Sequence, residues 1–407
     1  MKTLYLRKNE ERRLRAGHLW IFSNEVDTAR SPLKEFEPGE CARVVTSHGS
    51  PVACAYVNPA SLISGRIVSR DAGRALDADL LRARIAEALA LRERLYDAPY
   101  YRLVFSEGDY LPGLIVDRYG DVLCVQLSTA GMERVKATVA GVLRDLLRPR
   151  GILFKNDVSV RELEGLELYT ETVDEVPDAV EVVENGARFT VPLAGGQKTG
   201  WFYDMRDNRA AFARYAGGAA GANGATGPTG ADVLDIFSYA GGLGIAALAA
   251  GARSATCIDS SAPALEAARA SAALNDVADG LETVQGDAFE EMAALRDEGR
   301  QFEAVSLDPP AFIKRKKDAK QGEAAYLKAN RLALSLVANG GVFMTCSCSQ
   351  HLDADTLRKT LLHAAGDAGV RLRILERRSQ GRDHPVHPAM PETEYLKGFI
   401  AMVHRAK

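Results

Sequence analysis

Five apolar runs alternate with helical segments in the C-terminal part of this chain, and each run ends in polar or reactive residues. Alternation of strand and helix predicts a doubly wound α/β sheet with parallel strands. Ligands of such sheets bind beyond the carboxyl ends of the strands, so the functional residues should follow these runs directly. The runs cover residues 233–237, 254–259, 281–287, 304–308 and 341–346, and the helical segments between them include 244–250, 263–275 and 324–337.

The remaining length predicts two further domains, because 407 residues exceed one ordinary core. Residues 1–72 contain short β segments separated by Gly, Pro and Ser turns, which is typical of a small β-barrel. Residues 73–190 mix strands and helices without a βαβ rhythm, so we expect a central α+β domain there. Residues 191–407 then form the α/β domain. Within it, the Gly- and Ala-rich stretch 217–230 predicts a flexible surface insertion without chemistry.

Composition favours a soluble, cytoplasmic protein, with 46% hydrophobic and 26% charged residues. No apolar stretch is long enough to span a bilayer, and the basic N-terminus lacks the apolar core of a secretory signal. Six cysteines are scattered without a CxxC pair, which argues against a disulfide framework or a structural zinc site. No metal is expected either, because His384 and His387 lack an evident third ligand.

Acids follow four of the apolar runs, at Asp235, Asp259, Asp287 and Asp308. The glycines after Asp235 would let a ligand approach the backbone, and Asp259 could accept both hydroxyls of a ribose. Asp287 fits an acceptor for an adenine amino group, while two prolines after Asp308 form a rigid turn that presents it to a planar base. One such acid alone is more often a surface or capping residue, but four together favour an adenosine-like ligand. The absence of GxGxxG and of a following Lys-Ser/Thr disfavours nicotinamide dinucleotides and ATP.

From Asp235 to Phe312 the chain resembles a class I S-adenosylmethionine-dependent methyltransferase. Residues 195–209 resemble the extra motif that covers the cofactor in RNA 5-methylcytosine methyltransferases of the bacterial large-subunit rRNA type. The chain as a whole is similar to bacterial 23S rRNA cytosine-C5 methyltransferases with an N-terminal PUA domain. The resemblance implies S-adenosylmethionine as cofactor and, as its binding residues, Lys198, Thr199, Phe202, Asp204, Arg206, Asp235, Phe237, Ser238, Gly241, Asp259, Ser260, Asp287, Ala288 and Asp308.

Methylation of cytosine C5 needs a cysteine, because a thiolate must add to C6 before C5 becomes nucleophilic. The family places this nucleophile in a Cys-Ser element after the fifth strand, where the chain offers Cys346 and Cys348. Strand alternation puts both on the same side, and we prefer Cys348 because it lies further past the strand end. The plain alternative is that both are small buried residues. Asp308 would bind N3 of the base as the second catalytic residue, and the base that removes the C5 proton is left unassigned.

The partner implied by the resemblance is 23S rRNA, as free RNA or in a subunit. Residues 1–72 hold 11 Lys and Arg against 8 Asp and Glu, and their opening resembles a PUA module. Trp20 and Phe22 could stack on bases or belong to the barrel core. The target base must be flipped or unpaired. The residues expected to contact RNA are Pro309, Pro310, Lys314, Arg315, Arg7, Lys8 and Arg12.

Three other functions are left open by the sequence. An amino-group methyltransferase would use the same Asp-Pro-Pro turn without a thiol, and a 5-methyluridine enzyme would use the same thiol chemistry. An RNA-binding ribosome-assembly factor without catalysis is the third. The oligomeric state, including a homodimer, is also left open.

Overall fold

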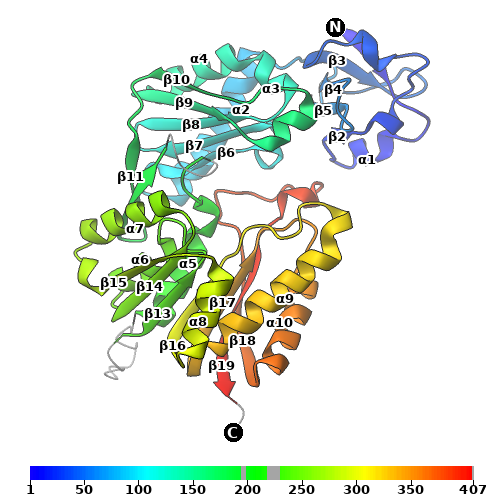
Figure 1. Cartoon of the computed structure of the whole chain (residues 1–407). Coiled ribbons are helices and arrows are strands. Elements are labelled where there is room, and N and C mark those ends of the chain that lie inside the picture. Colours follow the sequence, from blue (N-terminus) through cyan, green and yellow to red (C-terminus); the bar gives the residue numbers. More distant parts are fainter. Residues whose placement is uncertain (194–198, 218–229, 406–407) are drawn as a thin grey trace. The chain divides into compact units, whose positions relative to one another are not determined.

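The chain divides into two compact units in a computed structural model, which describes residues 1–193, 199–217 and 230–405 (Figure 1). The first unit comprises Met1–Asp178, Leu193–Tyr203 and Arg382–Thr393. The second comprises Ala179–Pro192, Asp204–Gly381 and Glu394–Lys407. Each unit is therefore built from segments that are far apart in the sequence. The predicted domain boundaries after residues 72 and 190 stay a prediction.

The N-terminal sheet of the first unit has five strands in the order β1-β3-β4-β5-β2. β1 runs parallel to β3, and the other neighbours are antiparallel. The sequence predicts β segments over residues 3–6, 41–46, 52–58 and 63–69, and four of these strands lie within two residues of them. Leu4, Val44 and Ile67 belong to the core of this sheet. The elements are β1 (Lys2–Tyr5), α1 (Glu11–Arg15), β2 (Trp20–Ile21), β3 (Glu40–Val45), β4 (Pro51–Val57) and β5 (Gly65–Ser69).

A second five-stranded sheet, in the order β10-β9-β8-β7-β6, completes the first unit. β8 and β9 are parallel and are joined through α3 and α4, so one βαβ connection exists where the sequence predicted none. The sequence predicts strands over 122–127 and 151–155 and a helix over 133–147. The direction of a neighbouring strand, however, depends on the crossover and not on the periodicity of any one element. The elements are α2 (Ala78–Leu95), β6 (Tyr100–Phe105), β7 (Leu114–Tyr119), β8 (Val122–Leu127), α3 (Ala130–Arg134), α4 (Lys136–Leu147), β9 (Gly151–Asn156) and β10 (Tyr169–Asp174).

The second unit contains a seven-stranded sheet in the order β15-β14-β13-β16-β17-β19-β18. The five strands from β15 to β17 are parallel, which confirms the predicted doubly wound sheet. β19 runs antiparallel to both of its neighbours and was not predicted. The strands are β13 (Asp232–Ile236), β14 (Ser254–Asp259), β15 (Leu281–Gln285), β16 (Phe302–Leu307), β17 (Val337–Ser347), β18 (Val370–Ser379) and β19 (Lys397–Arg405), beside a hairpin of β11 (Ala179–Glu184) and β12 (Ala187–Pro192).

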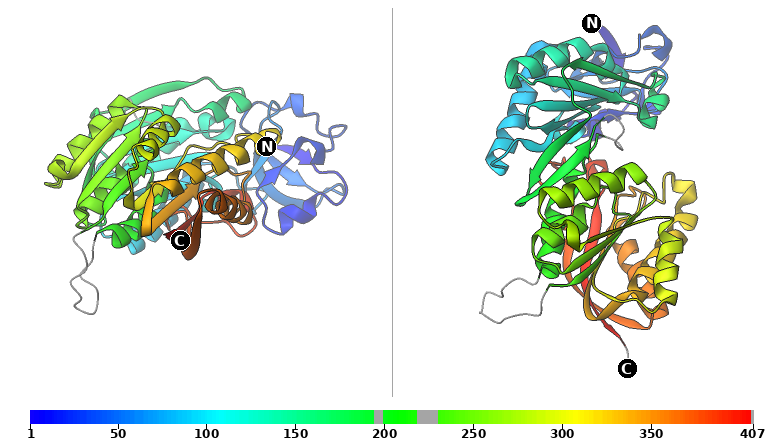
Figure 2. Two further views of the ribbon diagram at one scale, coloured as in Figure 1. Left: turned by 60° about the horizontal axis from the view of Figure 1, so that its bottom comes forward. Right: turned by 60° about the vertical axis from the view of Figure 1, so that its left-hand side comes forward.

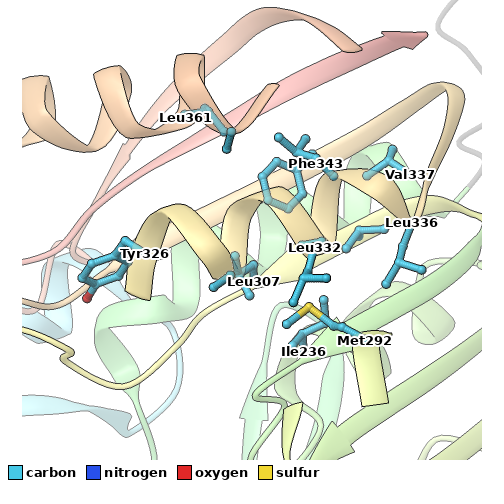
Figure 3. Packing of buried hydrophobic residues seen from close by; sticks show 14 of the residues in the cluster. Ile236, Met292, Leu307, Tyr326, Leu332, Leu336, Val337, Phe343 and Leu361 are labelled. Atoms are coloured by element: carbon cyan, nitrogen blue, oxygen red, sulfur yellow. The ribbon is translucent and has the colours of Figure 1, made fainter. Parts of the chain in front are cut away.

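Helices cover both faces of this sheet (Figure 2). On one face Met292, Leu332 and Leu361 pack against strand residues such as Ile236 and Phe343 (Figure 3). Each fully buried leucine of such a core contributes about 1.5–3 kcal/mol. The helices are α5 (Arg206–Ala216), α6 (Gly242–Ala249) and α7 (Ala262–Leu274), and, on the face of this core, α8 (Ala288–Asp297), α9 (Ala319–Ser335) and α10 (Ala354–Asp367).

The strand order reverses between β13 and β16, so the loops after these two strands diverge to opposite faces of the sheet. A ligand of a doubly wound sheet binds in the crevice that this divergence creates. Over the described ranges, no helix has both the length and the apolar character required to cross a membrane. Nor do His, Cys, Asp or Glu side chains of the described part gather into a group of three that could hold a metal ion.

Candidate active site at the carboxyl ends of the strands

Asp235 organises the glycine-rich turn after β13. Its buried carboxylate accepts hydrogen bonds from the Gly244 N–H at 2.9 Å and from the Ser306 hydroxyl at 2.8 Å. Gly241, the residue before α6, adopts a φ of +71°, which glycine tolerates without strain. Burial raises the pKa of Asp235 to about 6, although both hydrogen bonds oppose this rise. Asp235 therefore shapes the turn from inside the protein.

Asp259 links the loops after β13 and β14. Its carboxylate accepts from the backbone N–H of Tyr239 at 2.8 Å and from that of Ser261 at 2.9 Å. A carboxylate has about four acceptor positions, so capacity remains for the two hydroxyls of a ribose. The side chain is half-buried and within reach of a ligand, whereas the neighbouring Ser260 is exposed. This arrangement fits the predicted role of Asp259.

Asp287 caps helix α8. Its side chain accepts from the backbone N–H groups of Phe289 and Glu290 at 2.9 and 3.2 Å, and it is exposed. Ala288, the first residue of the helix, is buried. Capping explains the presence of an aspartate here without any ligand. The adenine-side role of Asp287 stays a prediction.

Three phenylalanines, from the loop after β13, the first turn of α8 and the loop after β16, form an apolar cluster. The ring centroids of Phe237, Phe289 and Phe312 lie 6.1–6.3 Å apart, and Phe312 contacts Tyr326 at 4.8 Å. All three phenylalanines are half-buried. Such a surface fits the flat apolar face of an adenine. Phe312 was not among the predicted site residues, although it directly follows the Asp-Pro-Pro-Ala turn.

Asp308 is the first residue after β16 and lies level with the end of β17. Its backbone N–H donates to the Ile236 carbonyl at 3.4 Å, and its side chain is half-buried. The register pairs Leu307 with Thr345, so Asp308 is close in the sheet to the two cysteines. Pro309 is buried and Pro310 is exposed.

The two cysteines after Thr345 differ in their surroundings. Cys346 lies inside β17, is fully buried and faces Gly398 of β19. Burial raises its pKa well above the ordinary range for a thiol. Cys348 follows the last residue of β17 and is half-buried. A thiol that must reach a substrate needs this partial exposure, and Cys346 lacks it.

A network of buried hydroxyl groups fixes the segment that carries Cys348. Ser347 donates to the Tyr326 hydroxyl at 2.9 Å, and the Tyr326 and Ser349 hydroxyls lie 2.9 Å apart. Figure 3 shows the Tyr326 hydroxyl pointing away from labelled apolar side chains such as Leu332 and Leu336. The Ser349 hydroxyl also accepts from the Ile313 N–H at 3.2 Å, which ties the Cys348 segment to the loop after Asp308. None of these residues was predicted, because they meet only in the folded chain.

The remaining cofactor residues predicted from the resemblance are divided between the two units. Asp204 accepts from the Tyr395 hydroxyl at 2.5 Å, and Arg206 lies 3.4 Å from Glu184, both within the second unit. Thr199 and Phe202 belong to the first unit. Lys198 lies outside the described residues.

The cationic side chains predicted to contact RNA are exposed. In the first unit Arg7 donates to the Val26 carbonyl at 3.1 Å and Arg12 donates to Asn9 at 3.3 Å. Lys8, Lys314 and Arg315 are exposed as well, and Arg315 lies 3.3 Å from Asp318. Of the two aromatic residues considered for stacking, Trp20 donates to Glu107 at 2.7 Å, and both Trp20 and Phe22 are half-buried.

Sequence models of two known families match the chain. Residues 4–70 match a PUA-like domain, and residues 168–399 match an S-adenosylmethionine-dependent methyltransferase. The second match spans more than half of the chain and covers the strands, turns and cysteines described above. The chain belongs to the S-adenosylmethionine-dependent methyltransferase family. S-adenosylmethionine is therefore the cofactor of this methyltransferase, and the carboxylate of Asp259 and the phenylalanine cluster suit its ribose and adenine.

Curated relatives align with this methyltransferase over nearly its whole length. A ribosomal RNA large subunit methyltransferase I from Klebsiella pneumoniae (strain 342) is 35% identical over 406 residues, covering 98% of each chain. The protein of the same name from Erwinia tasmaniensis is 36% identical over 410 residues, covering 98% of this chain and 99% of its own.

Solved structures show the same fold at low sequence identity. A putative S-adenosylmethionine-dependent methyltransferase from Streptococcus mutans aligns with a TM-score of 0.80 at 19% identity, over 99% of this methyltransferase and 100% of that chain. A putative methyltransferase complexed with SAH aligns with a TM-score of 0.82, also at 19% identity and with the same coverage. These likenesses concern the fold alone.

Proposed function

We propose that this methyltransferase transfers the methyl group of S-adenosylmethionine to carbon 5 of a cytosine in 23S rRNA, with Cys348 as the nucleophile. The observation that carries the proposal is the half-buried Cys348 just beyond β17, one strand away from Asp308, while Cys346 is sealed inside the strand. The curated relatives, named ribosomal RNA large subunit methyltransferase I, support rRNA as the substrate.

The loops after β13, β14 and β15 would hold the cofactor. Asp259 would accept hydrogen bonds from the ribose hydroxyls, and Phe289 would offer an apolar surface to the adenine. The turn that Asp235 and Gly241 shape receives the methionine moiety. When bound, S-adenosylmethionine supplies an electrophilic methyl group.

Cys348 makes the cytosine reactive. Its thiolate forms a bond to C6, and the electron pair of the C5=C6 bond becomes available at C5. C5 forms a bond to the methyl group as the bond between that group and the donor sulfur breaks, so that S-adenosylhomocysteine leaves, and a base then removes the C5 proton. The electron pair of the C5–H bond re-forms the C5=C6 double bond as the S–C6 bond breaks, and Cys348 is released as a thiolate. The protonated carboxyl group of Asp308 would donate a hydrogen bond to N3 of the ring and stabilise the negative charge that develops there.

RNA would approach this edge of the sheet with the target base out of the stack, because a stacked cytosine hides C6. The exposed Lys314 and Arg315 follow the Asp308 turn by a few residues and suit a phosphate backbone. The PUA-like domain, with Arg7, Lys8 and Arg12, provides a second basic surface.

The first prediction concerns the two cysteines. Cys348→Ala should lower the formation of 5-methylcytidine by roughly three orders of magnitude or more, because the nucleophile is lost. Cys346→Ala is the matched control and should retain activity within about tenfold, because that thiol is buried and never meets the base. Mass spectrometry of nucleosides from methylated rRNA measures both, and calorimetry with S-adenosylmethionine checks that each variant still binds the cofactor.

RNA containing 5-fluorocytidine gives a direct readout, since fluorine cannot leave C5 as a proton does. The native enzyme and Cys346→Ala should then form a covalent adduct that maps to Cys348. An adduct on Cys346 would reverse the assignment. If Cys348→Ala stayed fully active and the methyl group were on an amino nitrogen, the protein would be an amino-group methyltransferase. If the product were 5-methyluridine, the substrate would be a uridine. If the native protein did not bind S-adenosylmethionine, the alternative function would be that of an RNA-binding ribosome-assembly factor without catalysis.

A further inference from the structure

Lys397 is a half-buried lysine at the start of β19, directly across from Ser347 of β17. Its Nζ donates to the carbonyl oxygen of Ser349 at 2.6 Å. Among the described residues, no carboxylate forms an ion pair with this ammonium group, and burial lowers the pKa of Lys397. Partial burial of an ammonium group without a carboxylate partner costs free energy, and such groups are often found at functional sites.

The negative groups that face Lys397 come from three elements. Cys348 lies at the end of β17, Asp353 caps α10, and Glu394 precedes β19. Asp353 and Glu394 are both exposed, so water screens them, and Asp353 already accepts from the Thr356 N–H at 2.7 Å. Of the three, Cys348 as a thiolate would raise the pKa of Lys397 the most.

The carbonyl that Lys397 binds is itself held in place. Ser349 is fully buried, and its hydroxyl contacts both Tyr326 and the Ile313 N–H. The backbone N–H of Ser349 donates to the Ser347 hydroxyl at 3.2 Å. Lys397 therefore binds the carbonyl of the residue that directly follows Cys348 in the chain, and several hydrogen bonds hold that residue in place.

We infer that Lys397 is a positioning residue whose ammonium group keeps the Cys348 sulfur in its anionic, nucleophilic form. The thiol proton leaves to solvent, and the remaining thiolate is stabilised by the cation, which itself neither gains nor loses a proton. Thiolates are favoured beside lysines in this way. This inference rests on the proposed function for the identity of the nucleophile, and it adds the group that activates it.

The test is the alkylation of Cys348 by iodoacetamide, measured in the full-length protein between about pH 6 and pH 10, with each cysteine resolved by mass spectrometry. Lys397→Met should move the half-point of Cys348 alkylation upward by about one pH unit, and kcat near neutral pH should fall about tenfold while KM for S-adenosylmethionine is unchanged. Lys397→Arg keeps the cation and should keep the half-point. Lys359→Met, which removes an exposed lysine of α10, is the matched control and should change neither.

A second measurement leaves Lys397 in place, in case its replacement prevents folding. In Cys348→Ser the lysine loses its anionic neighbour, so its pKa falls further and its reaction rate with an amine-directed reagent at fixed pH rises. An unchanged alkylation profile in a folded Lys397→Met, or an unchanged lysine reactivity in Cys348→Ser, would overturn the inference. Both readouts are independent of the product nucleoside, so a failed cytosine assignment and a failed lysine role give different results.

Discussion

Cys346 and Cys348 carry the same side chain two residues apart, and their surroundings give them different chemistry. The strand buries the first sulfur against Gly398, whereas the second lies where β17 has ended. Desolvation disfavours a thiolate at the first position, and Lys397 favours one at the second. Reactivity at this site is therefore set by the position of each residue relative to the strand end.

A second prediction at the residue scale concerns how Asp235 makes the stability of the protein depend on pH. Its pKa of about 6 in the folded chain exceeds the ordinary value of 3.8, so its contribution to stability is complete below about pH 4 and is lost as the pH rises through 6. Asp235→Asn stays neutral, and its amide can accept from Gly244 and donate to Ser306. Relative to this variant, the native protein should lose about 3 kcal/mol between pH 4 and pH 7, measured from melting temperatures over that range.

The control is Asp259→Asn, since Asp259 is half-buried and keeps access to water. It should weaken S-adenosylmethionine binding, and its melting temperature is measured over the same pH range. A constant difference between the native protein and Asp235→Asn across the range would show that the buried carboxyl does not titrate there.

At the scale of elements, the packing of α6 on β14 depends on Gly244. A Cβ at this position would lie 2.6 Å from the sulfur of Cys257, while the next nearest atoms are 3.5 Å away. Gly244→Ala should destabilise the second unit by about 1–3 kcal/mol through overpacking, and it should weaken S-adenosylmethionine binding because α6 begins at the cofactor turn. Melting temperature and calorimetry measure the two effects.

The double variant Gly244→Ala, Cys257→Ala removes the clashing sulfur. We expect the two changes to couple favourably by about 1–2 kcal/mol, so that the pair is more stable than the sum of the single changes implies. Gly366→Ala in α10 is the control, because nothing lies within 4 Å of its Cβ position. It should stabilise by about 0.5–1 kcal/mol. Strictly additive effects at residues 244 and 257 would contradict the clash.

Four of the five parallel strands, β13, β14, β16 and β17, contain a buried apolar run that ends at a polar turn, which made them predictable, whereas β15 has no buried residue. The observed bounds of β13 and β14 lie within one residue of the predicted ones. β18 was missed because an edge strand with the sequence VRLRILERRS has no continuous apolar run. β19 is strongly apolar, but it lies far from any repeating strand–helix unit.

Some residues of the candidate site could be predicted from the sequence, and others could not. Asp259 and Asp308 could be predicted because they follow strands and because the family motifs contain them. Tyr326 and Lys397 could not, since each reaches Ser349 from an element more than twenty residues away in the chain. No local pattern encodes such a meeting. The pairing of β17 with β19 brings Lys397 to Ser349, and the packing of α9 against β17 brings Tyr326 there.

At the scale of the whole molecule, the charge on the PUA-like domain predicts the salt dependence of RNA binding. Arg7, Lys8 and Arg12 are exposed cations that could meet phosphates. Replacing all three by alanine should weaken rRNA binding and reduce the slope of log affinity against log salt by about 2, as expected for three lost contacts to single-stranded RNA. Filter binding over a range of salt concentrations measures this slope.

The matched control removes three cations that already have acidic partners in the same unit. Arg82, Arg84 and Arg144 pair with Asp145, Glu87 and Asp174. Their replacement changes net charge equally but should leave the slope within about 0.5 of the native value. An equal loss of slope in both triple variants would show that net charge, and not these three positions, determines the salt dependence. S-adenosylmethionine binding should be unaffected in both variants.

The segment Arg382–Thr393 completes the first unit from near the end of the chain. The buried guanidinium of Arg92 donates to the Asp383 carbonyl at 2.7 Å, and the Arg102 N–H donates to the Asp383 carboxylate at 2.9 Å. During synthesis on the ribosome, Arg92 and Arg102 must therefore wait until residue 383 has been translated before they find these partners. A polypeptide released early by a premature stop codon would leave Arg92 without this acceptor, which makes such a fragment a natural substrate for proteolytic quality control.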